Sequence, residues 1–322
     1  MDKEIISAKE LLKANIPKIE YLVEDIIPRA GLVYCFGSPG SFKTNFLLYT
    51  AISGSEGKDV FNFKIQKKFR TLWLDEENRE IGMKDKLCKI FNGMEVKEES
   101  LENIQISICA NFNILGKKSL EKLDEWITKY KPDMVVIDSI AKVFPLSERD
   151  EGDVRKIYTF LSPFIKKYGV TFILIHHARK RNFLQVSKDM EDISGSREFG
   201  AMADSILLLD EVNEGKYLLK QVKNRYSSKV YAENFEVTGN DEKIEISYMG
   251  KVKDAYLIRV LEVKSAISKW IGEKKITKFK RKEAVDVMKT CGYKESNIDK
   301  ALKLLKSSGE LTGEYGEYVY GK

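Results

Sequence analysis

Short apolar runs alternate with amphipathic segments up to about residue 240 of the chain. Continuous apolar runs of this length are typical of strands that crossover helices bury on both faces. The segment 120–130 has the apolar spacing of one such helix. The pattern therefore predicts an α/β fold with a mainly parallel sheet. The strand candidates are Leu32–Phe36, Thr71–Leu74, Ile104–Ile108, Met134–Ile137, Thr171–Ile175 and Ser205–Leu209. Antiparallel strands are expected to complete the sheet at Lys216–Val222, Val230–Val237 and Lys243–Tyr248.

Two polar stretches, Pro145–Val154 and Ala178–Ser196, have no apolar period, and the pattern changes near Met249–Asp254. Loops as long as the second stretch are usually functional when they occur inside a domain. The last part of the chain predicts three helices closed by a hairpin, which describes a small winged helix-turn-helix domain. Its expected elements are helices at Ala255–Ile271, at Arg281–Thr290 and from Ser296, with strands near Glu310–Thr312 and Glu317–Tyr320. We therefore divide the chain into a lead-in segment (1–30), a core domain (31–250) and a C-terminal domain (254–322).

Composition and charge narrow the class of protein. With 322 residues and 43% hydrophobic content, the chain can form a sizeable core. It has no run of 18 apolar residues and no N-terminal signal peptide pattern, so we expect a cytoplasmic protein that spans no membrane. Residues 251–322 carry 17 Lys/Arg and 10 Asp/Glu, a balance of +7, so the rest carries 6 − 7 = −1. A basic tail on a nearly neutral core points to a polyanionic partner.

One motif indicates a ligand. Between an apolar run and a helical run, the chain reads Gly-Ser-Pro-Gly-Ser-Phe-Lys-Thr. Backbone N–H groups and a helix N-terminus converge on an anion in such a strand–loop–helix unit, and Lys-Thr would serve a triphosphate and its Mg²⁺. The candidate nucleotide-binding residues are Gly37, Ser38, Pro39, Gly40, Ser41, Phe42, Lys43 and Thr44. Phe42 stands where the usual motif has glycine, and we expect a helical φ at this position. A serine- and glycine-containing turn before a core helix is the alternative.

Other candidate residues stand at the ends of predicted strands. Asp138 ends the strand 134–137 and would bind Mg²⁺ together with Thr44. The acids 75–77 follow another strand, and one of them would orient the attacking water. His177 is the second residue of a strand-end histidine pair, and Lys223 and Arg225 share one face of a late strand. Each feature has a structural alternative, respectively a helix cap, solvated carboxylates, a buried histidine and solvated cations.

In chain order, these elements resemble the RecA-like P-loop ATPases, and within them the RepA-type and DnaB-like replicative helicases (the AAA_25 group). The resemblance spans roughly residues 15–240. It implies that Glu77 is the catalytic glutamate, that His177 senses the γ-phosphate, and that Lys223 and Arg225 reach the nucleotide of a neighbouring subunit. ATP and Mg²⁺ would then bind between the subunits of a homo-oligomer, a ring or a filament, with a hexamer as the leading expectation.

The resemblance also implies DNA as the partner. It places Ala178–Ser196 near a central channel, and cations beside an aromatic residue are typical of single-strand grooves. The channel candidates are Arg179, Lys180, Arg181, Phe183 and Lys188. In the winged helix, the recognition helix would be about Ser296–Lys306, with Lys300, Lys303 and Lys306 toward duplex phosphates. Winged helices also dock proteins, which is the alternative for this domain.

The leading hypothesis is a DNA-dependent ATPase, a hexameric motor of the replicative helicase type. A regulatory, KaiC-like ATPase that does not translocate but presents the winged helix is a second hypothesis. A P-loop kinase for a small molecule is a third, against which the basic tail argues. The sequence does not discriminate the first two.

Overall fold

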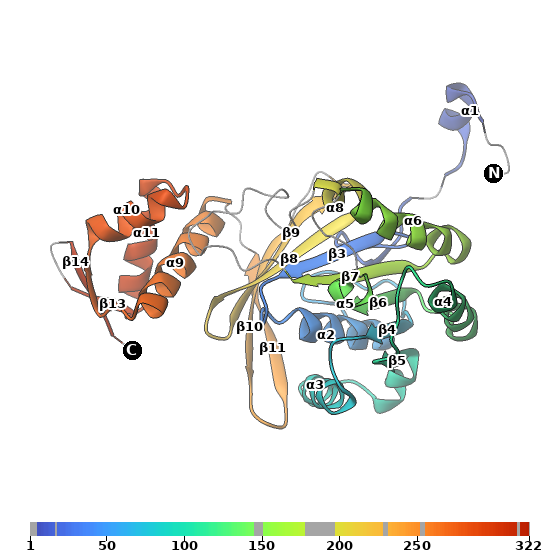
Figure 1. Ribbon diagram of the computed structural model, residues 1–322, viewed down its shortest axis with the longest axis horizontal. Coiled ribbons are helices and arrows are strands. Elements are labelled where there is room, and N and C mark those ends of the chain that lie inside the picture. Colours follow the sequence, from blue (N-terminus) through green and yellow to red (C-terminus); the bar gives the residue numbers. More distant parts are fainter. Residues whose placement is uncertain are drawn as a thin grey trace.

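The computed structural model describes residues 5–16, 18–144, 151–177, 197–227, 231–251, 255–313 and 316–321. Within them, the dominant feature is a nine-stranded sheet of order β11-β10-β9-β8-β3-β7-β6-β4-β5 (Figure 1). The strands from β8 to β5 are parallel to one another, whereas β9, β10 and β11 continue the sheet as antiparallel neighbours. The predicted α/β fold with a mainly parallel sheet is therefore confirmed. The parallel strands are β3 (Leu32–Gly37), β4 (Thr71–Asp75), β5 (Ile104–Ile108), β6 (Met134–Asp138), β7 (Thr171–His177) and β8 (Ser205–Asn213). The antiparallel strands are β9 (Lys216–Asn224), β10 (Ala232–Gly239) and β11 (Ile244–Lys251).

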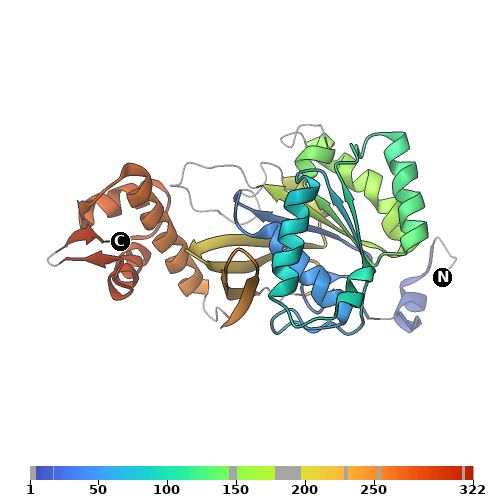
Figure 2. The same cartoon turned by 90° about the horizontal axis from the view of Figure 1, so that it is seen from below.

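The apolar strands separate two hydrophobic clusters, because alternate side chains point to opposite faces. Val33 and Cys35 of β3 join the cluster under α2 (Lys43–Glu56) and α3 (Glu80–Asn92). Tyr34 and Phe36 of the same strand join the cluster on the other face. That face is covered by α4 (Lys117–Tyr130), α5 (Ile140–Val143), α6 (Glu151–Tyr168) and α8 (Arg197–Met202) (Figure 2). The continuous apolar composition of the strands follows from this burial on both faces.

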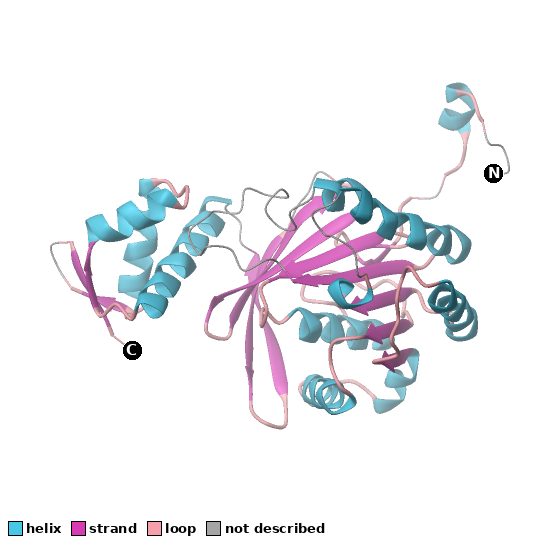
Figure 3. Cartoon of the chain, viewed as in Figure 1, coloured by secondary structure: helices cyan, strands magenta, loops and turns pink. Residues whose placement is uncertain are grey.

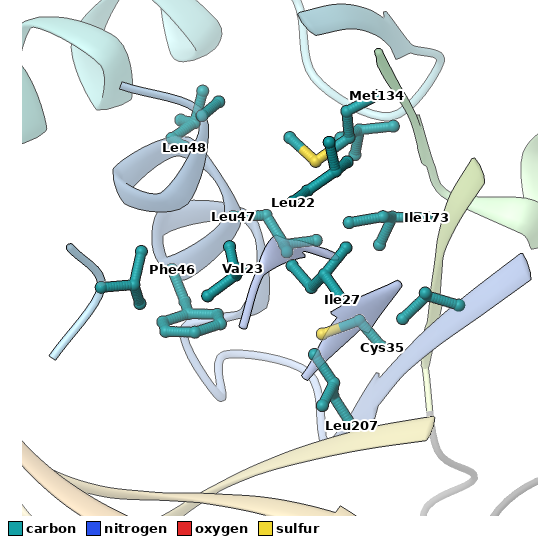
Figure 4. Close-up of a cluster of buried hydrophobic side chains, with 14 of the residues drawn as sticks. Leu22, Val23, Ile27, Cys35, Phe46, Leu47, Leu48, Met134, Ile173 and Leu207 are labelled. Carbon is teal, nitrogen blue, oxygen red and sulfur yellow. The ribbon is translucent and has the colours of Figure 1, made fainter. Parts of the chain in front are cut away.

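The residues before β3 contribute to the core. A hairpin of β1 (Tyr21–Val23) and β2 (Ile27–Pro28) buries Leu22, Val23, Ile26 and Ile27 beside α2. Figure 4 shows Leu22, Val23 and Ile27 packed near Leu47, Cys35 and Met134. The short helix α1 (Ala8–Lys13) begins with a Ser7–Glu10 capping box and buries none of its residues. The 3₁₀ helix η1 (Glu98–Asn103) precedes β5.

The C-terminal part has a hydrophobic core of its own, in which α9 (Ala255–Lys274), α10 (Arg281–Thr290) and α11 (Glu295–Ser307) pack together. A three-stranded antiparallel sheet of order β12-β14-β13 closes this unit (Figure 3). Its strands are β12 (Lys278–Lys280), β13 (Leu311–Thr312) and β14 (Glu317–Tyr320). The helices and the hairpin agree with the predicted elements, and β12 is an addition. The designation as a winged helix-turn-helix domain, and the division of the chain at residues 30 and 250, remain predictions.

One capping detail of α11 differs from the expectation. The helix begins one residue before Ser296, and its N-cap residue, Lys294, makes no side-chain capping hydrogen bond. Asp299 is engaged elsewhere, because Arg281 of α10 donates to both of its carboxylate oxygens at 2.7 and 2.8 Å. The S-x-x-D spacing of Ser296 and Asp299, which resembles a capping box in the sequence, therefore forms no capping box in the structure. Separately, the helices within the described ranges all lack the combination of length and apolarity needed to cross a membrane.

Candidate functional site

The loop between β3 and α2 contains two residues with left-handed backbone conformation. Gly40 (φ 81°) and Phe42 (φ 68°) are left-handed, and Ser41 between them is not. Alternating handedness of this kind turns successive N–H groups toward one point and makes an anion-binding nest. Gly37 is required for a different reason, since a Cβ there would lie 2.2 Å from the Leu209 carbonyl oxygen and 2.3 Å from Ser41 Oγ. The loop therefore has the alternating backbone pattern of an anion-binding nest, in which Ser41 N–H donates to the Ser38 carbonyl at 3.1 Å.

Phe42 contradicts the expectation of a helical φ. The residue is the N-cap of α2, with φ 68° and ψ 12°, and its carbonyl accepts the first helical hydrogen bond from Phe46 N–H at 2.8 Å. The difference is caused by tertiary contacts of the Phe42 side chain. The Phe42 ring packs against Tyr217 of β9 and Phe235 of β10, with centroids 5.2 and 6.2 Å away. Such contacts can offset the strain of a left-handed non-glycine residue.

Lys43 folds back onto the loop. Its Nζ donates to the carbonyl oxygens of Gly37 at 2.9 Å and Ser38 at 2.7 Å, and to Ser41 Oγ at 3.2 Å. Burial lowers the pKa of this ammonium group, although the acids around it act in the opposite direction. The cation therefore lies at the centre of the loop, where a phosphate oxygen can replace the loop oxygens as its acceptor.

Thr44 and Asp138 meet at the start of α2. Thr44 Oγ1 donates to Asp138 Oδ2 at 2.8 Å. Burial raises the pKa of Asp138 to about 6; the Thr44 hydrogen bond lowers it, and nearby Asp75 and Glu77 raise it further. A hydroxyl beside a carboxylate is a donor set that suits Mg²⁺, which prefers oxygen ligands. The repulsion among these carboxylates is a second sign of fit, because a divalent cation would relieve it.

The three acids after β4 have different environments. Asp75 is fully buried, and its Oδ1 accepts from the N–H groups of Glu77 at 3.0 Å and Asn78 at 2.7 Å. Glu76 instead accepts the N–H groups of residues 110, 111 and 112 at 3.0 to 3.1 Å. Glu77 is exposed, and it raises the pKa values of both Lys43 and Asp138. Of the three, only Glu77 combines nearness to the loop with an exposed side chain.

The histidine pair ends β7 directly beside the loop. His177 pairs with Gly37 across the parallel strands. His176 points to the other face, where its buried ring lies 5.0 Å from Phe36 and 5.2 Å from Phe199. His176 is thus a core residue, and the backbone of His177 stands at the carboxyl edge of the sheet with the other candidates.

Lys223 and Arg225 are not brought to this edge. Strand β9 is antiparallel to β8, so its end lies level with the beginning of β3: Lys223 pairs with Ile206, which pairs with Tyr34. Both cations bend toward α8, as the common face predicts. Lys223 Nζ donates to the Gly200 carbonyl, and Arg225 donates to Ala201 O at 2.6 Å and lies 3.4 Å from Asp204. At about 3.3 Å per residue, the level of Tyr34 is roughly 10 Å from Gly37.

The DNA-binding candidates fall into two groups. Arg179, Lys180, Arg181, Phe183 and Lys188 lie outside the described residues. Lys300, Lys303 and Lys306 are exposed on α11, while Ile298, Ala301, Leu302 and Leu305 face the C-terminal core. The basic face of α11 is therefore turned to solvent, away from its own core.

Sequence reasoning missed Asp210 and Lys86. Asp210 ends the buried part of β8 beside the loop, and burial raises its pKa to about 6 against the influence of Lys43 and of Lys269 from α9. An acid after an apolar parallel strand is the same signal that identified Asp138, so it was available. Lys86 of α3 donates to Asn78 Oδ1 at 2.6 Å and lowers the pKa of Asp138. No motif marks a lysine on an amphipathic helix.

Comparison with known proteins identifies relatives of this arrangement. The family model AAA_25, described as an AAA domain, matches residues 5–182, more than half of the chain. The DNA repair protein RadA of Halalkalibacterium halodurans is 25% identical over 168 residues, which is 49% of this chain and 34% of that protein. RadA of Listeria monocytogenes is 23% identical over 225 residues, 67% of this chain and 41% of that protein. The chain thus spans less than half the length of either protein. A KaiC-like protein of Pyrococcus horikoshii superposes with a TM-score of 0.47 and 22% identity over 70% of this chain and 93% of its own.

Proposed function

This chain belongs to the AAA_25 family of AAA domains, and we propose that it is a DNA-dependent ATPase whose active site a second copy completes. The family supports ATP binding and hydrolysis. The finer statement, a ring-shaped motor of the replicative helicase type working on DNA, is our proposal. The KaiC-like alternative, an assembly that hydrolyses ATP without moving along DNA, differs in its response to single-stranded DNA.

The observation that carries the ATPase proposal is the convergence of the loop with Thr44, Asp138 and Glu77. These residues come from α2, β6 and the end of β4, and they meet at the carboxyl edge of the sheet. The N–H nest and Lys43 would bind the triphosphate, and Thr44 and Asp138 would hold Mg²⁺. Bound there, Mg²⁺ would offset charge on the phosphate oxygens. Glu77 would orient the attacking water. Its backbone is held in place because the N–H groups of Glu77 and Asn78 donate to Asp75 Oδ1.

The direction of β9 supports completion by a second copy. Lys223 and Arg225 stand near the opposite edge of the sheet from their own loop, farther than their side chains reach. A hydrolytic site of this kind gains greatly from a cation that neutralises developing phosphate charge. We therefore infer that Arg225 serves the site of a neighbouring molecule, and in a closed homo-oligomer every copy both gives and receives one such cation. Among the ring and filament assemblies that the family resemblance implies, we propose a hexamer.

A mixing experiment tests this arrangement. Lys43→Ala should abolish ATP binding, and Arg225→Ala should lower turnover at least about a thousandfold with little change in ATP affinity. Mixed together, the two inactive variants should recover part of the activity, because an intact loop then meets an intact Arg225 from its neighbour. Arg155→Ala, which removes an exposed arginine of α6, is the control and should retain turnover. Recovery absent in mixed assemblies, or loss of ATP affinity in Arg225→Ala, would contradict the shared site.

The same preparations test the DNA proposal. The motor hypothesis expects single-stranded DNA to stimulate ATP turnover of an oligomer. An oligomer whose ATP turnover does not change with single-stranded DNA would favour the KaiC-like alternative. A monomer whose ATP turnover DNA does not stimulate would rule out the helicase-type function. Light scattering gives the oligomeric state in each case.

A further inference from the structure

Phe42 is a bulky residue in a conformation that glycine adopts freely. For an L-residue, the left-handed region brings Cβ against the backbone, and phenylalanine has no short polar side chain to compensate. The nest nevertheless needs this conformation at position 42, since Gly40 and Phe42 together give the loop its alternating handedness. Some contact outside the loop must therefore hold Phe42 in place.

The contact is aromatic and comes from the antiparallel strands. The ring of Tyr217, at the start of β9, lies 5.2 Å from the Phe42 ring, and Tyr217 itself stacks on Phe235 at 5.4 Å. Phe235 also lies against Phe46 and Phe61, and Phe61 stacks on Tyr248 of β11. Tyr217 and Phe235 are buried. Phe42 thus lies at the edge of an aromatic cluster that extends from the core to the loop, next to Tyr217 at 5.2 Å and Phe235 at 6.2 Å.

We propose that Tyr217 is a positioning residue for nucleotide binding, which acts by holding Phe42 in the left-handed conformation that forms the N–H nest. The proposal rests on the proposed ATP-binding function of the loop. Tyr217 itself is placed to touch the Phe42 ring, and its effect on the triphosphate passes through the backbone of residue 42. Glycine at position 42 would need no such support.

A double-mutant cycle tests the proposal, with ATP affinity measured by calorimetry in the presence of Mg²⁺. In the natural background, Tyr217→Leu should weaken ATP binding about tenfold, the size expected for the strain of one left-handed residue. Phe42→Gly alone should change the affinity less than about threefold, because glycine takes the conformation freely. In the Phe42→Gly background, Tyr217→Leu should then have almost no effect on affinity. A general loss of stability would be common to both backgrounds, so it cannot produce this difference.

Matched variants separate the ring contact from other changes. Tyr217→Phe keeps the ring and should bind ATP as the natural protein does. Tyr248→Leu removes an aromatic residue from the same cluster that contacts Phe61 and should also leave affinity unchanged. Phe42→Leu keeps apolar bulk without the ring and should bind more weakly than Phe42→Gly. This ordering can be read even if Tyr217→Leu does not fold.

Two results would overturn the proposal. Equal losses from Tyr217→Leu in both backgrounds would mean that Tyr217 acts independently of Phe42. Weaker binding by Phe42→Gly than by Phe42→Leu would mean that the phenylalanine ring is not a source of strain. Failure of the natural protein to bind ATP is a separate outcome, which would remove the proposed function and this inference with it.

Discussion

The negative charge with which Asp138 would bind Mg²⁺ also destabilises the fold, because the carboxylate is buried. Its pKa is raised to about 6 by burial, from an ordinary value of 3.8, so the folded state binds the proton more tightly than the unfolded chain does. Between these values, stability should therefore fall as pH rises, by up to about 3 kcal/mol for this group alone. At neutral pH the buried carboxylate is ionised, which destabilises the fold, and the proposed Mg²⁺ would offset this charge.

Asp138→Asn should separate the two effects. Without Mg²⁺, the variant should be more stable than the natural protein at pH 7.5, by about 1–3 kcal/mol, because no buried charge remains. The natural loss of stability from pH 4 to 6 should also become smaller, and Mg²⁺-dependent ATP hydrolysis should be lost. Urea unfolding at several pH values measures the first two effects. The control is Asp124→Asn: Lys167 and Tyr168 lower the pKa of Asp124, so this variant should gain no stability. An unchanged pH slope in Asp138→Asn would contradict the argument.

At the residue scale, motif spacing predicted the loop and Asp138 as site candidates. It could not predict which environment each of several neighbouring acidic residues would have. Asp75, Glu76 and Glu77 are chemically alike in sequence, and their environments depend on a loop at residues 110–112. The φ of Phe42 depends on rings from β9 and β10, far along the chain. These facts come from tertiary contacts, which no local pattern contains.

At the scale of elements, Glu76 links β4 to the segment after β5. Its carboxylate binds three consecutive backbone N–H groups, at Ala110, Asn111 and Phe112. Next to it, Cys109 Sγ donates to the Asn78 carbonyl at 3.2 Å, and Cys109 N–H donates to Asp75 O at 2.7 Å. The turn that carries Glu77 is thus fixed to this segment on two sides.

Glu76→Ala should disturb catalysis more than ATP binding. Three N–H groups would lose their acceptor, at about 1–3 kcal/mol for each one left without water. The turn that carries Glu77 would loosen, while the contacts of Lys43 and Thr44 stay intact. We expect kcat to fall about tenfold or more with the ATP affinity changed less than threefold. Steady-state turnover and calorimetry measure the two quantities. Glu80→Ala, an exposed acid in the first turn of α3, is the control. A loss of affinity equal to the loss of kcat would place Glu76 in phosphate binding instead.

The central strands β3, β4, β6, β7 and β8 were predictable because each contains a continuous apolar run buried on both faces. Each predicted run of the large sheet overlaps a strand of the structure. The short strands β1, β2 and β12 were not predicted, for a physical reason. They are two or three residues long, too short to show an alternation of period two. Their pairing is decided by the elements they pack against.

At the scale of the whole molecule, the C-terminal part contacts the large sheet at one edge of the candidate site. Helix α9 contacts β8, and its Lys269 lowers the pKa of Asp210 beside Lys43. The sequence predicted a basic C-terminal module, but it could not predict that the first helix of this module contacts β8, the strand that carries Asp210. Strand β11, which precedes α9, lies at the edge of the sheet, and its last residue, Lys251, is level with Leu209 of β8 through β10 and β9.

The charge of this module leads to the last prediction, on DNA binding. On α11 the acids Glu295 and Asp299 are paired with Arg281, and Lys289 also binds Glu295. The lysines 300, 303 and 306 of the same helix are exposed. If the basic face of α11 binds duplex phosphates, replacing all three lysines by alanine should weaken binding similarly for all sequences. It should also reduce the slope of log K against log salt by about 2 to 3, since each phosphate contact contributes about 0.9. Fluorescence anisotropy of a labelled duplex at several salt concentrations measures both.

The matched control replaces Lys117, Lys118 and Lys122, which are exposed on α4. Equal slopes for the two triple variants would mean that α11 makes no phosphate contacts and would favour protein docking as the role of this module.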